Sequence, residues 1–264
     1  IESSIGKHYQ FIHRLTGDKT TRGTQGMWIL STDKIPNISS LNTHFGLSWD
    51  FSEYTMTSEF YYRSMDDLIQ FKESSIPVTA LRNDRGEEES LINIGSGTAN
   101  GIEFLLRKRK GLITGWLSYQ RNKTQYTFPN LNQGKPFFSD HDKTQEFKSV
   151  FMTNIGSWEL TANWVFASGH VYTDSENVDV ENLQIIISSD RNESRLPPIH
   201  HLDVSFSKTW VVSIAKIHTG LSIYNLYDRN NISHKRYNPY TSELTMTDVV
   251  MFGITPTIFL QISF

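Results

Sequence analysis

Apolar and polar residues alternate along the last ten residues of the chain, Thr255–Phe264. A period of two places successive side chains on opposite faces of a β-strand. Ten residues is also about the length of a strand that crosses a lipid bilayer at a tilt. An ordinary core strand has the same pattern, so this segment alone does not choose between the two structures. The residues of its apolar face are Pro256, Ile258, Leu260, Ile262 and Phe264.

The same alternation predicts nine further strands, which makes ten in total. It is strict from Leu41 to Phe51, weak from Lys7 to Arg14, and less clear from Phe147 to Ile155, where both faces are partly apolar. No segment has a helical apolar period over the roughly 10–12 residues that a helix needs. The nine further predicted strands are Lys7–Arg14, Leu41–Phe51, Tyr54–Met65, Gly101–Lys108, Leu112–Gln120, Phe147–Ile155, Trp158–Phe166, His201–Ser207 and Lys216–Ile223.

Short and long connections alternate between the predicted strands. The long connections have the polar, Gly- and Pro-containing composition of loops, and compact soluble domains rarely repeat structureless loops longer than about 12–15 residues. Transmembrane barrels have short turns on one side of the membrane and long loops on the other. Counting strands backwards from Phe264 puts every short turn on the side of that residue. The short connections are Ser52–Glu53, Arg109–Gly111, Gly156–Ser157 and Trp210–Val212, and the long ones are Thr16–Ser39, Asp67–Thr98, Gln125–Thr144, Gly169–Pro198 and Leu226–Ile254.

The composition fits either a soluble domain or a transmembrane barrel. The 264 residues are 38% hydrophobic, with a net charge of −3 and a mean hydropathy of −0.40. A barrel has such values because half of each strand faces a polar interior. The 12% aromatic content favours the barrel, since its interfacial girdles contain Trp, Tyr and Phe.

Composition and the first residues also exclude several classes of site and partner. The near-neutral charge argues against a nucleic acid partner, and the absence of cysteine excludes disulfides and thiolate metal sites. Residues Ile1–His8 do not have the pattern of a signal peptide. Because Ile1 is not an initiator Met, we expect a processed chain or a fragment.

Seven short strings follow one another along nearly the whole chain. They are Ser58-Glu-Phe-Tyr-Tyr-Arg-Ser-Met-Asp-Asp-Leu-Ile, Gly101-Ile-Glu-Phe-Leu-Leu-Arg-Lys, Gly115-Trp-Leu-Ser-Tyr, Phe128-Pro-Asn-Leu-Asn-Gln-Gly, Phe166-Ala-Ser-Gly, Leu196-Pro-Pro-Ile-His-His-Leu-Asp and Leu221-Ser-Ile-Tyr-Asn-Leu-Tyr-Asp-Arg-Asn. In this order and spacing the strings resemble the C-terminal half of TonB-dependent outer-membrane receptors.

The resemblance implies an all-β fold, a transmembrane antiparallel β-barrel, of which residues 1–264 would supply about ten C-terminal strands. The family's barrel has 22 strands around an N-terminal plug domain. Neither a plug nor a TonB-binding motif is recognisable in this sequence, so both are expected on another chain or in a region not included here. Ten strands alone would leave two unpaired edges in lipid, which the absence of water forbids.

Three groups of residues are candidates for transport, ligand binding and membrane targeting. Polar residues on the inner face of the strands would line the lumen: Glu59, Arg63, Glu103, Trp116, Asp203 and His218. Aromatic residues in the long loops would contact ligand, since loops on a rigid scaffold usually carry binding residues: Trp28, Phe137, Phe138, Tyr172, Tyr237 and Tyr240. The resemblance implies that insertion machinery reads the terminal strand with Ile258, Leu260, Ile262 and Phe264.

A set of aromatic residues should lie on the outer surface, most of them near a membrane interface. Aromatic rings prefer that zone because one part of the ring is apolar and the other tolerates water. A shift of one residue in the register would move a strand's side chains to the other face. The predicted set is Tyr9, Trp49, Phe51, Tyr54, Tyr119, Trp158 and Phe264.

Four other clusters are better explained without chemistry. The acidic stretch from Asp174 lacks the glycine and the terminal Glu spacing of a calcium-binding EF-hand, so we interpret it as a solvated loop. His200 and His201 point to opposite faces and would not share a metal. Asp140-His141-Asp142 lacks a nucleophilic serine in a Gly-x-Ser-x-Gly context. The basic run Arg107–Lys110 is interpreted as a charged cap at a short turn.

The sequence therefore predicts part of a TonB-dependent transporter in the Gram-negative outer membrane, energised through the missing plug. No enzyme activity, metal or cofactor is predicted. The partners would be outer-membrane lipid, the remaining strands, the plug, the TonB complex and a lipoprotein lid if the cargo is a glycan or peptide. The cargo itself is not identified. The alternative is a soluble all-β binding module, for example for glycans, in which the apolar faces pack against each other.

Overall fold

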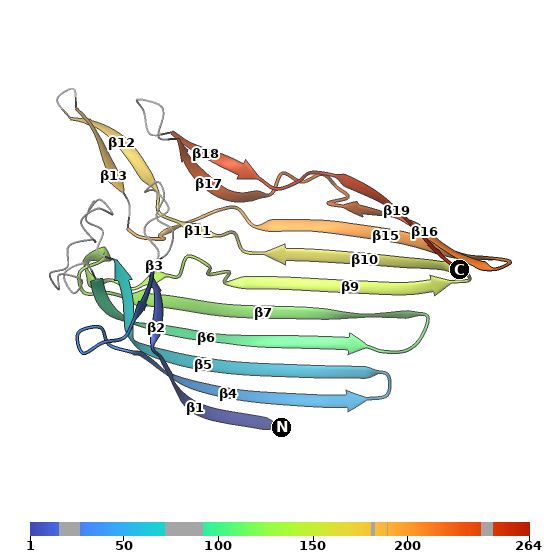
Figure 1. The fold of residues 1–264 in the computed structure, drawn as a ribbon, viewed down its shortest axis with the longest axis horizontal. Coiled ribbons are helices and arrows are strands. Elements are labelled where there is room, and N and C mark those ends of the chain that lie inside the picture. Colours follow the sequence, from blue (N-terminus) through green and yellow to red (C-terminus); the bar gives the residue numbers. More distant parts are fainter. Residues whose placement is uncertain (16–26, 72–91, 181–182, 189, 239–244) are drawn as a thin grey trace.

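The computed structural model describes a chain built almost entirely of antiparallel β-strands (Figure 1). The described part contains one helical element, the three-residue 3-10 helix Asn132–Gly134. Everything said below about the structure concerns residues 1–15, 27–71, 92–180, 183–188, 190–238 and 245–264.

Ten long strands form one continuous antiparallel sheet, in which strands that follow each other in the chain lie side by side. The all-β fold and the ten predicted strands are thus confirmed. The bounds are β1 (Glu2–Gln10), β4 (Ile38–Phe51), β5 (Tyr54–Phe71), β6 (Ile92–Lys108), β7 (Ile113–Thr127), β9 (Gln145–Ile155), β10 (Trp158–Ala167), β15 (Ile199–Val212), β16 (Ala215–Tyr224) and β19 (Thr255–Ser263).

Three of the predicted boundaries are wrong. β1 lies earlier than Lys7–Arg14, because the polar residues of its first half hide the alternation. The segment Trp210–Val212 is not a turn but the end of β15. Strands β5 and β6 continue into the predicted loop Asp67–Thr98, since their pairing resumes after an irregularity in register between Met65 and Leu68.

Each of the four short turns contains a residue with positive φ. These residues are Ser52 (53°), Gly111 (105°), Gly156 (62°) and Ser213 (50°). Tight connections between twisted antiparallel strands favour positive φ, which glycine adopts without steric cost. The two serines adopt the same left-handed region at a cost of about 1–2 kcal/mol each.

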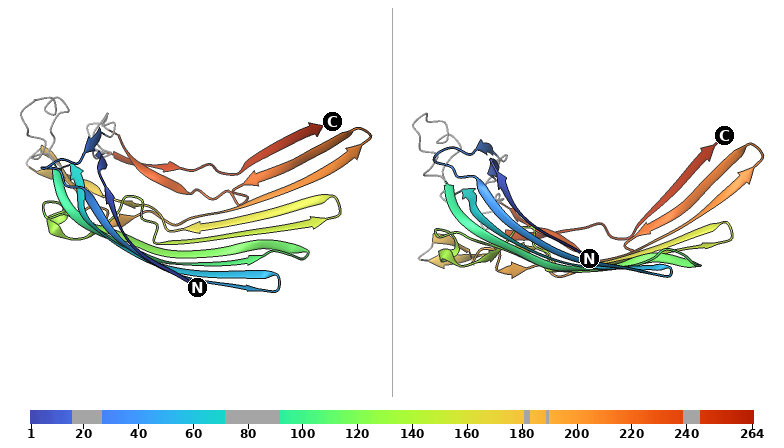
Figure 2. Two further views of the ribbon diagram at one scale, coloured as in Figure 1. Left: turned by 60° about the horizontal axis from the view of Figure 1, so that its bottom comes forward. Right: turned by 90° about the horizontal axis from the view of Figure 1, so that it is seen from below.

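The long strands are staggered and the sheet is curved. Glu2 faces Gly46 while β4 runs five residues further to Phe51. In the same way Trp158 faces Lys208 while β15 runs four residues further to Val212. A stagger of this kind accompanies the strand tilt of a barrel wall. The sheet forms an open trough (Figure 2), and within the described residues its edge strands β1 and β19 each pair with only one neighbour.

The strand register sorts the side chains of the sheet into an apolar face and a polar face. Directly opposed residues share a face, and the pairs Phe45–Phe60, Phe60–Ile102 and Phe104–Tyr119 lie on the apolar one. The same face continues through β9, β10, β15, β16 and β19. All the residues predicted for the outer surface belong to it: Tyr9, Trp49, Phe51, Tyr54, Tyr119, Trp158 and Phe264.

The described residues leave the apolar face uncovered. Phe45 is 44% exposed, Phe206 37% and Ile258 80%. The buried apolar residues lie instead in the long connections and at the adjoining strand ends. They are Ile35, Ile92, Phe128, Leu131, Phe137, Ala167, Val171, Leu196 and Ile199. The sheet therefore lacks a hydrophobic core of its own, and the soluble sandwich with packed apolar faces is not the structure observed.

The long connections contain short strand pairs, so the expectation of structureless loops is wrong. Apart from Phe137–Phe138, which pairs with the end of β7, the strands of these connections pair with each other and so satisfy their backbone hydrogen bonds away from the main sheet. Their strands are β2 (Ile12–Leu15), β3 (Met27–Leu30), β8 (Phe137–Phe138), β11 (Val171–Tyr172), β12 (Ser175–Val180), β13 (Leu183–Ser188), β14 (Ser194–Arg195), β17 (Ile232–Asn238) and β18 (Thr245–Val250).

Candidate functional site: the polar face and the loop platform

The six residues predicted to line a lumen all lie on the polar face of the sheet. The register places Glu59 opposite Glu103, and Arg63 opposite Asn42. Arg63 Nε donates a hydrogen bond to Asn42 Oδ1 at 2.7 Å. The remaining members, Trp116, Asp203 and His218, lie on the same face of β7, β15 and β16.

Carboxylates form a row across neighbouring strands of this face. Glu59 faces Glu103, Glu103 faces Gln120, and Gln120 faces Glu146. Gln120 Nε2 donates to Glu146 Oε2 at 2.8 Å, and Lys148 Nζ lies 2.7 Å from the same oxygen. Glu59 lies 3.6 Å from His44 Nε2. Glu103 has no cationic partner among the described residues, so this part of the row has excess negative charge.

A recess of about 200 Å³ is centred on the same row. Its polar lining comes from adjacent strands of the sheet, and the carboxylates of Glu59 and Glu103 contribute to it. The polar lining residues are Thr57, Glu59, Glu103, Ser118 and Gln120. Phe104, Leu105 and Tyr119 complete the lining, so a ligand or protein segment seated there would meet two carboxylates beside an apolar surface.

Asp203 has a structural role in addition to its place on the polar face. Its Oδ1 lies 2.9 Å from His201 Nδ1 and accepts a 2.9 Å hydrogen bond from the backbone N–H of Asn225. Asn163 Nδ2 donates to Oδ2 at 3.3 Å. Asp203 therefore ties β10, β15 and the connection after β16 together. His218, by contrast, packs edge-on against Phe259 and has a buried Nε2 without a partner among the described residues.

The aromatic residues predicted as ligand contacts have different environments. Phe137 is 4% exposed and packs with Phe128 and Leu131, so it belongs to a small core of the loops rather than to their exposed surface. The pattern of loop aromatics did not reveal this small core, because loop residues have no period. Phe138 is half-buried, with Lys123 and Arg195 5.9 and 5.3 Å from its ring centroid.

The other aromatic residues predicted to contact ligand lie in three different long connections. Trp28 is 65% exposed and faces Arg14, whose guanidinium carbon is 5.9 Å from its ring. Tyr172 lies under Lys235, with 5.2 Å between Nζ and the ring centroid. Tyr237 belongs to β17, but its side chain lies outside the described part, as does the whole of Tyr240. Trp28, Phe138 and Tyr172 stay predictions as ligand contacts.

A buried ion pair fixes the loop platform, by which we mean the connections Phe128–Thr144 and Gly169–Leu196. The side chain of Asp142 is fully buried, and its Oδ2 accepts from Arg195 at 2.8 Å and from Thr144 Oγ1 at 2.9 Å. Arg195 also donates to the carbonyl of Gly169 at 2.8 Å. Asp140-His141-Asp142 is therefore a loop anchor. Its other carboxylate, Asp140, accepts from buried Asn192 at 2.8 Å.

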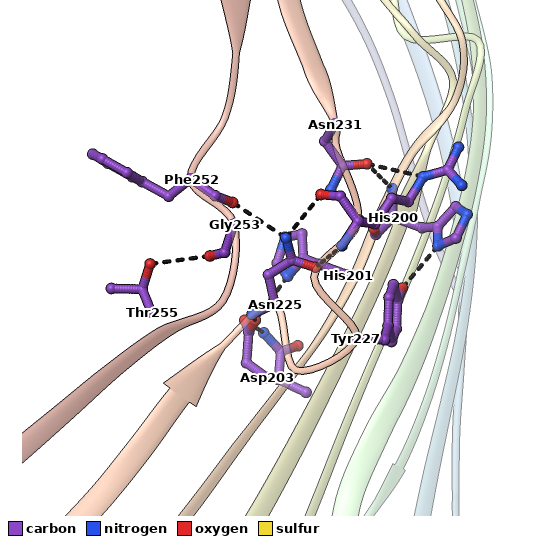
Figure 3. A network of polar contacts seen from close by, with 11 residues as sticks. His200, His201, Asp203, Asn225, Tyr227, Asn231, Phe252, Gly253 and Thr255 are labelled. Atoms are coloured by element: carbon purple, nitrogen blue, oxygen red, sulfur yellow. Dashed lines mark hydrogen bonds and ion pairs between the residues drawn. The ribbon is translucent and has the colours of Figure 1, made fainter.

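Two asparagines that the sequence analysis did not single out anchor the next connection (Figure 3). Asn225 is fully buried, and its Nδ2 donates to the carbonyls of Arg229 and Phe252 at 2.9 and 3.2 Å. Asn231 is 1% exposed and exchanges 3.0 Å hydrogen bonds with the backbone N–H and C=O of His200. Asn225 thus ties the two ends of the connection together, and Asn231 holds its first part against β15. The string from Leu221 contains Asn225, a residue type that favours backbone-capping turns, and Asn231 follows directly after it.

The two adjacent histidines have separate surroundings. His200 Nδ1 lies 2.7 Å from the hydroxyl of Tyr227, whereas His201 pairs with Asp203 on the other face. The basic run is a turn cap, in which Lys108 lies 3.4 Å from Glu53 and Arg109 3.2 Å from Asp50. Asp174 engages in contacts within the protein, and the stretch after it lies in β12.

The described residues contain no group of three or more His, Cys, Asp or Glu side chains arranged to hold a metal ion. Within the same residues, no helix has the length and apolar character needed to span a membrane.

The chain resembles known proteins in three-dimensional structure but not in sequence. No protein-family model matches the chain, and no curated protein matches its sequence. Among solved structures, the ferric yersiniabactin uptake receptor FyuA from Yersinia pestis matches with a TM-score of 0.60 and 13% identity, over 98% of this chain and 34% of the receptor. This chain has the fold of part of a TonB-dependent receptor barrel.

A second solved structure agrees. BauA, the ferric preacinetobactin receptor from Acinetobacter baumannii, matches with a TM-score of 0.53 and 12% identity, over 98% of this chain and 33% of that chain. The chain thus spans about a third of the length of the receptors it matches. Both are named as receptors and neither as an enzyme. At this identity the likeness is one of fold.

Proposed function

We propose that this chain forms the C-terminal part of the barrel of a TonB-dependent outer-membrane transporter. Its apolar face would contact lipid and its polar face the lumen. The observation that carries the proposal is the position of charge on the apolar face. Counted along the strands, Lys108 and Lys208 lie within four residues of the short-turn end, whereas Lys7, Asp66, Arg121 and Lys123 lie eight or more residues from it.

A charge-free band between two charged rims fits a bilayer. A Lys or Arg at the midplane of a lipid-facing barrel surface costs about 2–4 kcal/mol, but almost nothing near the interfaces. On a sheet exposed to water, charged residues could lie at any position along the strands. The exposed side chains of the band, such as Phe45 and Phe206, would be favourable in lipid and unfavourable in water.

The two edges of the sheet support the proposal that the remaining strands of the barrel are the first partner of this chain. β1 and β19 each have one long strand beside them in this chain. Unpaired backbone groups in hydrocarbon cost several kcal/mol each, so a membrane sheet must close. About two thirds of the length of the matched receptors has no counterpart here, which is sufficient to supply both the missing strands and a plug.

The carboxylate row supports a plug domain with basic side chains as the second partner. Glu59 and Glu103 face each other from adjacent strands, and Glu103 has no cation beside it among the described residues. A partner that brings Lys or Arg to this row would relieve the repulsion between like charges. Energy from the inner membrane would then reach the barrel through TonB bound to this plug.

A ferric chelate is the cargo that the comparisons support best, because the two matched receptors are named for ferric yersiniabactin and ferric preacinetobactin. A siderophore receptor needs no lipoprotein lid, which the glycan and peptide alternatives would favour. The exposed Trp28 and the half-buried Tyr172 lie at the loop end, where an incoming chelate would arrive.

Growth on iron tests this function. A strain that lacks the complete receptor should fail to grow on one ferric siderophore as the only iron source, and should grow normally on ferrous iron. Removing TonB should cause the same defect. Normal growth of the deletion strain on a broad panel of ferric siderophores would contradict the cargo. Recovery of the native protein in detergent-free soluble extracts would contradict the membrane transporter itself.

A further inference from the structure

One cation on the apolar face is held between two tryptophan rings. Lys208 lies on β15 near the short-turn end, and its Nζ is 3.7 Å from the ring centroid of Trp210 and 5.0 Å from that of Trp158. Trp158 is directly opposite Lys208 on the neighbouring strand, and Trp210 is two residues further along the same strand. All three side chains therefore project from one face of the sheet.

The other lysine at this rim has a different environment. Lys108 is also on the apolar face at the short-turn end and also lies near an aromatic ring, 5.8 Å from Tyr54. Its charge is neutralised by Glu53 at 3.4 Å. Lys208 has no carboxylate partner within the described residues. Glu159, which is close in sequence to Trp158, lies on the polar face and hydrogen-bonds to Ser207 there.

The cluster of Lys208, Trp158 and Trp210 is rich in donors and lacks acceptors. The lysine ammonium and the two indole N–H groups donate only, and across the described ranges none of the three has a hydrogen-bond acceptor in the protein. Both indoles are close to half exposed. A group with several negatively charged oxygens would complement all three donors.

The adjacent row of the same face is apolar. Moving away from the short turns, the next opposed residues are Leu160, Phe206 and Leu221. Leu160 and Phe206 are each more than a third exposed. A donor cluster followed by an apolar strip has the polarity of a lipid, with the headgroup at the rim and the acyl chains toward the middle of the sheet.

We propose that Lys208, Trp158 and Trp210 form a binding site for the phosphate headgroup of an anionic glycerophospholipid in the membrane leaflet at the short-turn rim. The site rests on the membrane placement in the proposed function, but not on the cargo or on TonB. The lysine contacts the phosphate, the indoles donate to phosphate or ester oxygens, and the acyl chains follow Leu160, Phe206 and Leu221. Anionic lipid surfaces attract such cations in general; here two rings fix the position of one.

Native mass spectrometry of the complete receptor with added phosphatidylglycerol tests the site. Lys208→Met should weaken binding of the most tightly held lipid about fivefold, the effect expected for one lysine at an anionic surface. Lys108→Met is the matched control and should leave this affinity unchanged, because Lys108 is already paired. Lys208→Arg should retain most of the binding, since a guanidinium also binds phosphate.

Each other outcome has a defined meaning. Equal lipid affinity in Lys208→Met and Lys108→Met would overturn the site, and so would equal competition by inorganic phosphate at the same concentration. Heat-modifiable migration on gels reports whether each variant is inserted as a barrel. A wild-type receptor that never inserts would refute the membrane placement, whereas an inserted receptor with unselective lipid binding would refute only this proposal.

Discussion

The sheet and the loop platform are stabilised in opposite ways. The long strands have side chains that stay exposed on both faces, and their order comes from backbone pairing over ten strands. The loop platform contains small apolar clusters such as Phe128, Leu131 and Phe137, and buried polar anchors such as the Asp142–Arg195 ion pair. Only the loop end resembles the interior of a soluble protein.

This difference indicates that the folded loop platform and the folded sheet are surrounded by different solvents. The loop platform carries its own buried contacts, as a structure in water must. The sheet instead leaves its apolar side chains for something outside the chain to cover, and its polar face for a lumen and a partner. Lipid is the cover that we propose, so changes to the two regions should have different consequences.

The largest effect should come from placing a charge on the apolar face. Phe206→Arg should destabilise the inserted barrel by about 2–4 kcal/mol and reduce its assembly, because Arg would then lie in the hydrocarbon. Ser205→Arg, one residue away on the polar face, should change stability by less than about 1 kcal/mol. Urea unfolding in lipid vesicles measures both, and equal losses in the two variants would break the comparison.

Loss of the buried anchor should affect the loops and spare the sheet. Asp142→Leu would leave Arg195 without its carboxylate and should destabilise the loop platform by about 2–3 kcal/mol. Hydrogen exchange should accelerate in β8, β11 and β14 and at the loop end of β7, where the Thr124 N–H donates to Asp142 Oδ1 at 3.1 Å, but not in the rest of the long strands. Asp248→Asn is the control, because it breaks an exposed ion pair with Lys235 and should have little effect. Uniform acceleration across the sheet would contradict separate stabilisation.

Deletion of Phe264 should separate assembly from stability. The ring lies at the end of the strand paired with β16 and is 94% exposed in this chain. Loss of its contact with lipid should cost only about 1–3 kcal/mol. The amount in the outer membrane should fall sharply, while any inserted barrel keeps its heat resistance. Normal surface abundance would refute the targeting role of the terminal strand, but not the barrel.

The smallest effect should be a pH dependence confined to the first loop hairpin. Burial lowers the pKa of His13, and a hydrogen bond to the Pro36 carbonyl opposes that shift in part. The unfolded hairpin therefore takes up the proton first as pH falls below about 6.5, so the stability of β2–β3 is full above that pH and decreases below it. After correction for the intrinsic base-catalysed exchange rate, the protection of the β2–β3 amides should fall by at most about tenfold per pH unit, roughly the limit for one proton. His13→Gln should remove the dependence, and its persistence in that variant would exclude His13 as the cause.

The sequence predicts the sheet well because a strand with two different environments must alternate. From Leu41 to Phe51 that period alone identifies β4 and its faces. It fails at Trp210–Val212, where three successive apolar residues hide the continuing strand. Phe137 could not be assigned to a core, because its partners Phe128 and Leu131 are brought to it by loop geometry without any period. The anchoring roles of Asn225 and Asp142 likewise depend on backbone groups distant in sequence.

Site-by-site labelling along β15 of the complete receptor in its membrane tests the central claim most directly. The chain has no cysteine, so single cysteines at positions 202 to 207 need no background removal within it. We predict that a lipid-soluble thiol reagent labels positions 202, 204 and 206, while a small water-soluble reagent labels 203, 205 and 207 more readily. Equal access of the water-soluble reagent to both sets would contradict a lipid-facing apolar face.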